Sequence, residues 1–274
     1  MHIPEDIWGI MKYITQKTQT KLDVFITLHK KDIPVLKFCI YSILQYLQPK
    51  ANRIVIISDD IPHNILAEYK SVEFLHESNV FNCFTLAQMP KIIHGSENRT
   101  GWYFQQFLKW EARKYSTTDD YVVVDADTVF IEPIILIQDS KYVFYRSDKY
   151  YSPYLKTYEK LFGYLPEKQM SYIADFMTFN TRILDEIITK IEKINSPKKW
   201  YEIILDAIDK KELSSFSEFE TYGYYMCKYH PNLFDSKKYR NKILQKEKIP
   251  YHTFNKIINK LRGYVSISYH CYDR

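Results

Sequence analysis

Short apolar segments alternate with segments of helical periodicity through the first half of the chain, and this alternation limits the possible fold more than any other feature. Residues 24–28, 53–58 and 121–124 have the composition of buried strands. Apolar residues recur every three or four positions over residues 33–47 and 101–115, which is typical of helices that pack one face on a sheet. Repeated strand–helix–strand units predict an α/β fold with a mostly parallel central sheet flanked by helices.

The second half of the chain is less regular and adds shorter elements. A Tyr-rich segment over residues 147–171 contains prolines and a glycine, so we expect a loop or lid there. With no long linker or repeat, we expect a helical N-terminal extension over residues 1–21 and a single domain over residues 22–274 with an embellished helical C-terminal half. The elements predicted in this half are strands over residues 141–145, 176–179 and 265–268, and helices near residues 181–194, 198–210 and 218–228.

Composition and residue spacing exclude several functional classes. The 274 residues include 38 Lys and Arg against 33 Asp and Glu, and 46% are hydrophobic, as in folded globular proteins. The six glycines form neither G-x-G-x-x-G nor a phosphate-binding G-x-x-x-x-G-K-S/T motif. The four cysteines have no C-x-x-C spacing, which argues against a zinc site. The N-terminal residues lack the features of an export signal, so we expect a cytoplasmic protein with reduced thiols.

The most informative motif is a pair of aspartates at the end of a predicted buried strand, where Tyr121-Val-Val-Val leads directly into Asp125-Ala126-Asp127. Side chains at positions i and i+2 of an extended chain point the same way, so both carboxylates should project together. Open α/β sheets bind ligands at this edge. Buried carboxylates need a cation, which favours Mn²⁺ or Mg²⁺ completed by phosphate oxygens. The alternative is a surface loop with two solvated aspartates.

One enzyme class with such a motif is the haloacid-dehalogenase type of phosphatase. Its first motif, an apolar strand followed by D-x-D-x-T/V, resembles the segment from Asp125 to Val129. Asp125 would then be the nucleophile that accepts the phosphoryl group, and Asp127 the acid/base. That class places the motif on an early strand and needs a later Gly-Asp motif. Here a long α/β segment precedes the motif and no later strand leads into Gly-Asp, so this class fits less well.

Six segments of the chain together match a second class. Asp125-Ala126-Asp127 matches a D-x-D motif, and the run Ser217-Glu218-Phe219-Glu220-Thr221-Tyr222-Gly223 is similar to an S-E-x-E-x-Y-G segment of bacterial and viral polysaccharide-type enzymes. With these segments the chain resembles the GT-A fold of nucleotide-sugar glycosyltransferases. The resemblance implies metal-dependent transfer of a sugar from a nucleoside-diphosphate donor to a hydroxyl group of a glycan or other acceptor. The other matching segments are residues 23–29, 53–60, 101–110 and 174–180.

The resemblance also implies a set of metal ligands. Asp125 and Asp127 would hold Mn²⁺ or Mg²⁺ against the donor diphosphate. GT-A enzymes often supply a C-terminal His as a further ligand, and His270, just after the last predicted strand, matches that position.

Residues that bind the donor are expected at the ends of the first strands and on one helix. Thr27 lies at the end of the first strand of the matched fold, and His29 and Asp59 directly follow the first and second strands, where the nucleotide is expected. Gln105 and Lys109 are four residues apart and so share one helix face. We expect Lys109 to contact the diphosphate as a point charge.

A transferase that inverts configuration needs a base for the acceptor hydroxyl group. Glu218 and Glu220 are the first candidates, and Asp175 competes with them. Ser217 and Glu220 also have the spacing of a capping box at a helix start, which is a purely structural role. A transferase that retains configuration uses another proton path, for which no residue is nominated.

The expected partners are a nucleoside-diphosphate sugar of the UDP or GDP type and a glycan or lipid-linked glycan acceptor. Residues 236–262 contain nine Lys or Arg and one acid. This stretch indicates a solvated basic helix surface, or else a patch that attracts the inner membrane face or an acidic or diphosphate-linked acceptor. No nucleic-acid partner is expected, because no recognition motif is present. A non-catalytic module that binds nucleotides or glycans is the alternative to an enzyme.

Overall fold

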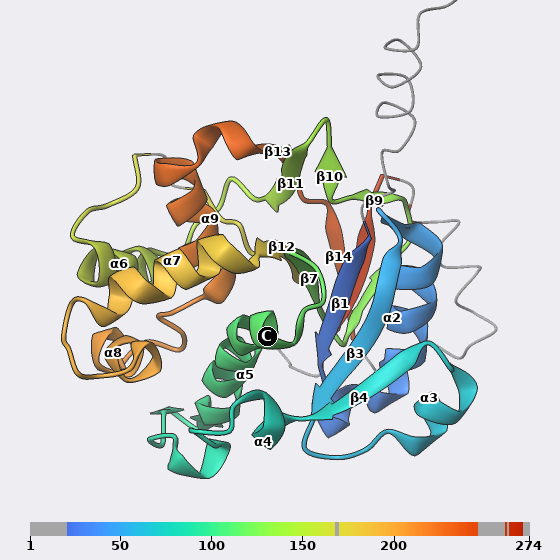
Figure 1. The fold of residues 1–274 in the computed structure, drawn as a ribbon, viewed down its shortest axis with the longest axis horizontal. Helices are drawn as coiled ribbons and strands as arrows, with labels where there is room; N and C mark the ends of the chain where they lie inside the picture. Colours follow the sequence, from blue (N-terminus) through green and yellow to red (C-terminus); the bar gives the residue numbers. More distant parts are fainter. Residues whose placement is uncertain (1–20, 168–169, 246–260, 262, 271–274) are drawn as a thin grey trace, which may run out of the picture.

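The computed structural model describes residues 21–167, 170–245, 261 and 263–270. The central sheet has five strands in the order β12-β7-β1-β3-β4 (Figure 1). The first four strands in chain order run parallel, and the fifth lies antiparallel to β7 at one edge, which confirms the predicted mostly parallel sheet. These strands are β1 (Leu22–Thr27), β3 (Ala51–Ser58), β4 (Val72–His76), β7 (Asp120–Asp125) and β12 (Phe176–Asn180).

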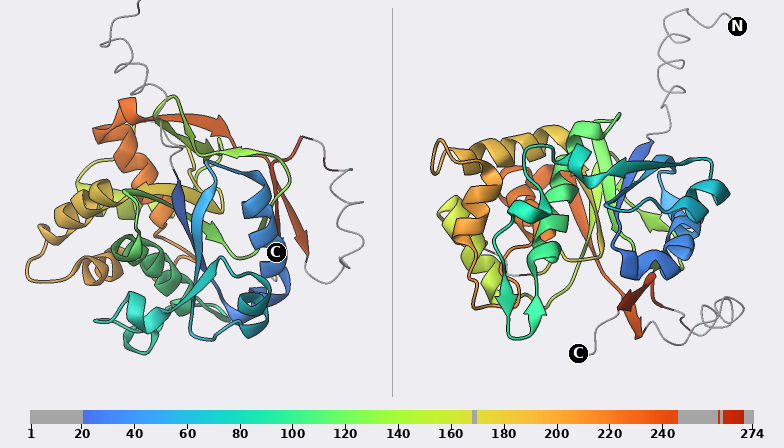
Figure 2. Two further views of the ribbon diagram at one scale, coloured as in Figure 1. Left: turned by 45° about the vertical axis from the view of Figure 1, so that its right-hand side comes forward. Right: turned by 90° about the horizontal axis from the view of Figure 1, so that it is seen from below.

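The central strands are buried on both faces, because each face packs against its own layer of helices (Figure 2). Val24 and Val124 belong to the apolar core shared with α2 (Ile33–Tyr46). Phe25 and Val123 point the other way, into a larger core rich in aromatic side chains. The helices of that second core include α5 (Thr100–Glu111), α7 (Thr181–Glu192), α8 (Trp200–Ala207) and α9 (Glu218–Tyr229).

Strands from the C-terminal part of the chain return to the region that follows β7. β15 (Ser266–His270) lies between β14 (Asn241–Gln245) and β8 (Thr128–Phe130), and β8 begins directly after the D-x-D motif. A second small sheet joins β11 (Lys141–Arg146) to the partners β10 (Ile137–Gln138) and β13 (Phe234–Lys238). The last described residues of the chain are therefore brought next to the centre of the sheet.

The segment predicted to be a loop or lid, residues 147–171, contains α6 (Ser152–Phe162), so that prediction was wrong in part. Pro153 and Gly163 suggest a loop in the sequence, but the proline sits in the first turn of the helix, where it is well tolerated. Gly163 ends the helix with φ of 77°, a conformation that suits glycine.

The described part of the basic stretch, residues 236–245, belongs to strands β13 and β14 and not to a helix. Both are edge strands whose partners are distant in the sequence, and local periodicity does not show such pairing. The predicted N-terminal extension lies outside the described residues except for Lys21. Within the described ranges we find no helix with the length and apolar content needed to cross a membrane.

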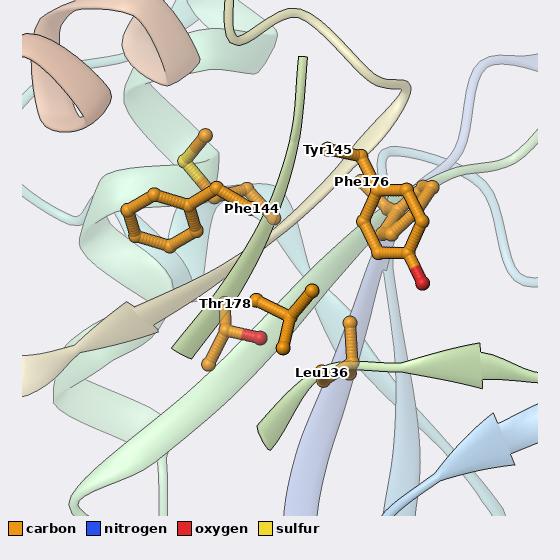
Figure 3. Close-up of a pocket in the computed structure, with 7 residues that line it drawn as sticks. Leu136, Phe144, Tyr145, Phe176 and Thr178 are labelled. Carbon is orange, nitrogen blue, oxygen red and sulfur yellow. The ribbon is translucent and has the colours of Figure 1, made fainter. Parts of the chain in front are cut away.

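A small gap in the packing lies between β11 and β12 (Figure 3). Leu136, Phe144, Tyr145, Phe176 and Thr178 line it, and all five are buried. The gap does not admit a water molecule, so it belongs to the core and is no binding site.

The remaining strands and α-helices of the described residues are β2 (Leu47–Gln48), β9 (Ile134–Ile135), β5 (Ile93–His94), β6 (Glu97–Asn98), α3 (His63–Glu68) and α4 (Glu77–Val80).

Candidate active site

The two aspartates of the D-x-D motif lie at the C-terminal edge of the central sheet. Asp125 is the last residue of β7 and pairs in register with Thr27, the last residue of β1. The Asp125 amide donates a hydrogen bond to the Asp175 carbonyl at 2.8 Å. The carbonyl of Asp127 accepts a hydrogen bond from the Tyr269 amide at 3.0 Å. The motif is thus held between β1 on one side and the C-terminal strand β15 on the other.

Both carboxylates act on one buried thiol. Cys39 of α2 is fully buried, and its thiol donates a hydrogen bond to the Asp125 carbonyl at 3.7 Å. Burial raises the pKa of this thiol well above its usual value, and the charges of Asp127 and Asp125 raise it further. Asp125 and Asp127 therefore both lie near enough to Cys39 for their charges to act on its thiol.

Lys109 of α5 is buried between two carboxylates. Its Nζ lies 2.6 Å from Asp125 Oδ1 and 2.6 Å from Glu218 Oε1. Burial by itself lowers the pKa of Lys109, but the two carboxylates outweigh burial and raise the pKa, so the side chain is an ammonium ion. The sequence predicts that Lys109 contacts a diphosphate, whereas here its ammonium group binds two acids of the protein.

Glu218 begins α9 and is held there through both its backbone and its side chain. The Glu218 amide donates to Gln106 Oε1 at 3.0 Å, while its carboxylate accepts a hydrogen bond from Lys109. Burial raises the pKa of Glu218, the charge of Lys109 opposes this, and Asp125 adds to it. α5 and α9 therefore meet at this charged group.

Glu220, two residues further along α9, lies in a different environment. Ser217 caps the helix, because its hydroxyl oxygen accepts a hydrogen bond from the Glu220 amide at 3.3 Å. This is one half of the capping box that the sequence suggests; the reciprocal bond from the Glu220 side chain does not form. The Glu220 carboxylate points away from the cap and accepts a hydrogen bond from the Tyr172 amide at 2.8 Å. Burial raises the pKa of Glu220 to about 7.

Asp175, the third candidate base, belongs to a polar network that joins β12 to the C-terminal strands. Its backbone has φ of 57°, in the left-handed region that is uncommon for aspartate. Its Oδ2 accepts hydrogen bonds from the Tyr239 hydroxyl (3.1 Å), Asn241 Nδ2 (3.1 Å) and the Ser268 hydroxyl (2.5 Å). This carboxylate is engaged in holding the C-terminal strands against the start of β12.

A cavity of about 600 Å³ opens at the same edge of the sheet. Four of the residues predicted to bind the donor line it, namely Thr27, His29, Asp59 and Gln105. The described residues that line it do not include Lys109, Asp125 or Asp127, but Thr27 pairs with Asp125 and Leu108 precedes Lys109. Its size is typical of small-molecule sites. The other lining residues include Leu28, Lys30, Lys31, Ile57, Glu77, Leu86, Glu97, Asn98, Arg99, Gly101, Trp102 and Phe104.

Comparisons with known proteins identify the group to which the chain belongs. A family model matches residues 19–257. The chain belongs to DUF6492, a family of unknown function. Comparison of this DUF6492 chain with curated proteins finds no match.

Solved structures show what this DUF6492 protein resembles in fold. The apo form of mouse xyloside xylosyltransferase 1 is similar over 92% of this chain and 98% of its own, with a TM-score of 0.51 and 12% identity. The apo structure of the bifunctional glycosyltransferase WbbM matches 94% of this chain and 47% of its own, at 12% identity and a TM-score of 0.45. The chain therefore has a GT-A-like glycosyltransferase fold.

Arg99 is one of the cavity residues that sequence reasoning missed in this DUF6492 protein. Arg99 lines the cavity, and its guanidinium group lies 4.3 Å from the centre of the Trp102 ring, a cation–π contact. Arg99 Nε is buried, with no hydrogen-bond partner in the described part of the chain. The available signal was a basic residue directly before the predicted helix, too common a feature to single out Arg99.

The residues present suit a divalent cation held together with phosphate. Mg²⁺ and Mn²⁺ are commonly bound by one or two carboxylates together with substrate phosphates. Asp125 and Asp127 would provide the carboxylates. No three His, Cys, Asp or Glu side chains in the described ranges are grouped as metal ligands. The His270 side chain lies outside the described residues, while its backbone follows Tyr269 beside Asp127. Its role as a ligand stays a prediction.

Proposed function

We propose that this protein is a metal-dependent glycosyltransferase, which moves a sugar from a nucleoside-diphosphate donor to a hydroxyl group of an acceptor. The observation that carries this proposal is the position of the D-x-D motif, at the carboxyl end of β7 and one strand from Thr27 in the wall of a 600 Å³ cavity. Ligands of open α/β sheets bind at this edge. The GT-A-like fold supports the same assignment.

The residues of the site divide into two groups by position. Asp125 and Asp127 would hold Mn²⁺ or Mg²⁺ against the diphosphate, and such an ion neutralises the charge that develops on the leaving group. Thr27, Asp59 and Gln105 line the cavity and would contact the nucleotide, together with His29. We propose a donor of the UDP or GDP type on the same grounds.

The acceptor in this proposal is a glycan or a lipid-linked glycan. Lys237, Lys238, Arg240 and Lys242 are exposed on β13, β14 and the turn between them. A row of cations on exposed strands attracts an anionic acceptor or an anionic membrane surface, at about 1 kcal/mol per residue near the membrane. Contact with the inner face of a membrane is thus part of the proposal.

The test is thermal unfolding with UDP and with GDP, each with and without Mn²⁺. A ligand present at about 100 times its dissociation constant stabilises the folded state by about 2.7 kcal/mol. We expect stabilisation by one nucleotide only when Mn²⁺ is present, and loss of that response in Asp127→Asn. The matched control is Asp206→Asn, an exposed aspartate of α8 paired with Lys198. A nucleotide sugar with the same base as the stabilising nucleotide should be hydrolysed slowly by the wild type and not by Asp127→Asn.

Two results would favour other functions. Hydrolysis of a generic phosphomonoester that is lost in Asp125→Asn, without any nucleotide response, would favour a phosphatase. Nucleotide binding that depends on Mn²⁺, with neither transfer nor donor hydrolysis across a panel of donors and acceptors, would favour a non-catalytic binding module.

A further inference from the structure

We infer that Glu218 is a positioning residue, which holds Lys109 against Asp125, and not the base that deprotonates the acceptor. The inference rests on the proposed function, because it assigns a role within the same site. Two carboxylates and one ammonium group from α5, α9 and β7 meet at 2.6 Å distances. Glu218 thus acts on the metal-binding carboxylate through Lys109.

Burial separates Glu218 from the space that an acceptor can enter. The residue is 3% exposed and Lys109 is 6% exposed. Glu218 is not among the described residues that line the 600 Å³ cavity. A general base must come within hydrogen-bond reach of the proton that it removes. The Glu218 carboxylate instead meets the ammonium group of Lys109, so reaching an acceptor would mean breaking a buried ion pair.

The backbone around this pair is fixed on both sides. The Gln106 side chain accepts a hydrogen bond from the amide of Glu218. The hydroxyl of Tyr121 donates a hydrogen bond to the carbonyl of Lys109 at 2.9 Å. The Phe219 ring covers the ammonium group, whose Nζ lies 4.5 Å from the ring centre. Groups held in this way orient the ligands of a metal site, and their loss typically weakens metal binding by about 10- to 100-fold.

The charge balance gives a physical reason for the arrangement. If Lys109 paired with Asp125 alone, the ammonium group would neutralise that carboxylate and weaken its attraction for a metal ion. Glu218 forms an ion pair with the same ammonium group. Two carboxylates then share one positive charge, which leaves net negative charge at the edge of the sheet beside Asp127. A divalent cation would offset this negative charge.

The test compares two replacements of Glu218. Glu218→Gln keeps an oxygen that accepts a hydrogen bond from Lys109 but takes up no proton, whereas Glu218→Leu removes the acceptor. For each variant we would measure the dissociation constant of Mn²⁺ with UDP and with GDP, and the kcat and KM of transfer. Lys109→Met and the double variant Lys109→Met/Glu218→Leu complete the set. Glu159→Gln, at an exposed position of α6, is the control.

A positioning role predicts that Glu218→Gln keeps kcat within about tenfold of the wild type, because conservative replacements preserve the supporting hydrogen bond. Glu218→Leu and Lys109→Met should each weaken binding of the Mn²⁺–nucleotide by about tenfold or more. The double variant should bind the Mn²⁺–nucleotide no more weakly than either single variant, because all three variants interrupt the same chain of contacts. Circular dichroism identifies variants that fail to fold. Glu218→Gln is expected to fold even if the other variants do not.

Two results would overturn the inference alone. One is a loss of about 100-fold or more in kcat for Glu218→Gln with unchanged Mn²⁺–nucleotide affinity, which is the behaviour of a general base. The other is unchanged affinity in folded Glu218→Leu. Failure of the wild type to bind either nucleotide with Mn²⁺ would instead overturn the proposed function, and the role of Glu218 with it.

Discussion

Acids lie at both ends of the strands of the central sheet, but their surroundings differ. At the amino-terminal edge, Asp23 of β1 accepts hydrogen bonds from Asn52 Nδ2 (2.9 Å), Arg53 Nε (3.0 Å) and both the amide and the hydroxyl of Thr117 (2.7 and 2.9 Å). Burial would raise the pKa of Asp23, but these donors, the Thr117 amide foremost, hold it below its usual value.

At the carboxyl edge, the acids are less completely compensated. Asp125 and Glu218 share the ammonium group of Lys109, and the pKa of Glu218 is raised by burial despite that partner. A cavity of about 600 Å³ lies beside this group. The same strands thus end in a satisfied structural cluster at one edge and in a charged group next to open space at the other. Such incomplete compensation favours a site that binds a ligand.

The largest expected effect is on activity at the carboxyl edge. Asp125→Asn removes the charge that would hold the metal ion and leaves the Lys109 ammonium group with Glu218 as its partner. We expect transfer to fall by about 100-fold or more. Initial rates at saturating Mn²⁺ check this, with Asp206→Asn as the control. A variant with nearly wild-type rates would show that the D-x-D carboxylate is structural and would remove the functional difference between the two edges.

The next effect is on stability at the amino-terminal edge. Asp23→Asn removes a buried charge from Arg53 and should lower the free energy of unfolding by about 2 kcal/mol at pH 7. Because the folded-state pKa of Asp23 is lowered, its stabilisation is present above the unfolded pKa of about 4 and is lost as the pH falls through the folded pKa. Urea unfolding between pH 2 and 7 measures this.

The rate of the proposed sugar transfer should stay unchanged in folded Asp23→Asn. If the stability difference from the wild type persisted at pH 2, Asp23 would not carry a lowered pKa, and the contrast between the edges would rest on position alone.

The smallest expected effect separates the two acids of α9. Burial raises the pKa of Glu220 in the folded state to about 7, whereas its pKa in the unfolded state is about 4. The folded state therefore holds this proton more tightly than the unfolded state does. The resulting contribution to the free energy of unfolding is complete below about pH 4 and is lost as the pH rises through about 7. Glu220→Gln keeps an oxygen for the Tyr172 amide and has no such loss. We expect it to exceed the wild type in stability at pH 8.5, by up to about 1.4 kcal/mol for each unit by which the pKa of Glu220 is raised, and to match it at pH 4.

Thermal or urea unfolding at the two pH values measures the difference, and Glu159→Gln is again the matched control. A difference that does not change with pH would show that Glu220 is ionised throughout, and that α9 does not place its two acids in different electrostatic environments.

Local patterns in the sequence were sufficient to predict the central strands, the main helices and the position of the D-x-D motif. Apolar periodicity is a local property, because it follows from which residues of one element face the core. The same reasoning failed for α6, where Pro153 and Gly163 indicate a loop although they begin and end a helix. It also failed for β13 and β14, because strand pairing with β11 and β15 depends on residues far away in the chain.

The partners of the charged residues were set by the tertiary fold. Periodicity places Lys109 on a face of α5, but not opposite Glu218, 109 residues later, because helical register does not specify which element packs against that face. For the same reason the sequence suggested Asp175 as a base and did not show the hydrogen bonds from Asn241 and Ser268 that engage it. The sequence alone established the fold class and the two acids at the strand end, since these depend on near neighbours. Packing of distant elements established which acid meets Lys109, which meets a backbone amide and which borders the cavity.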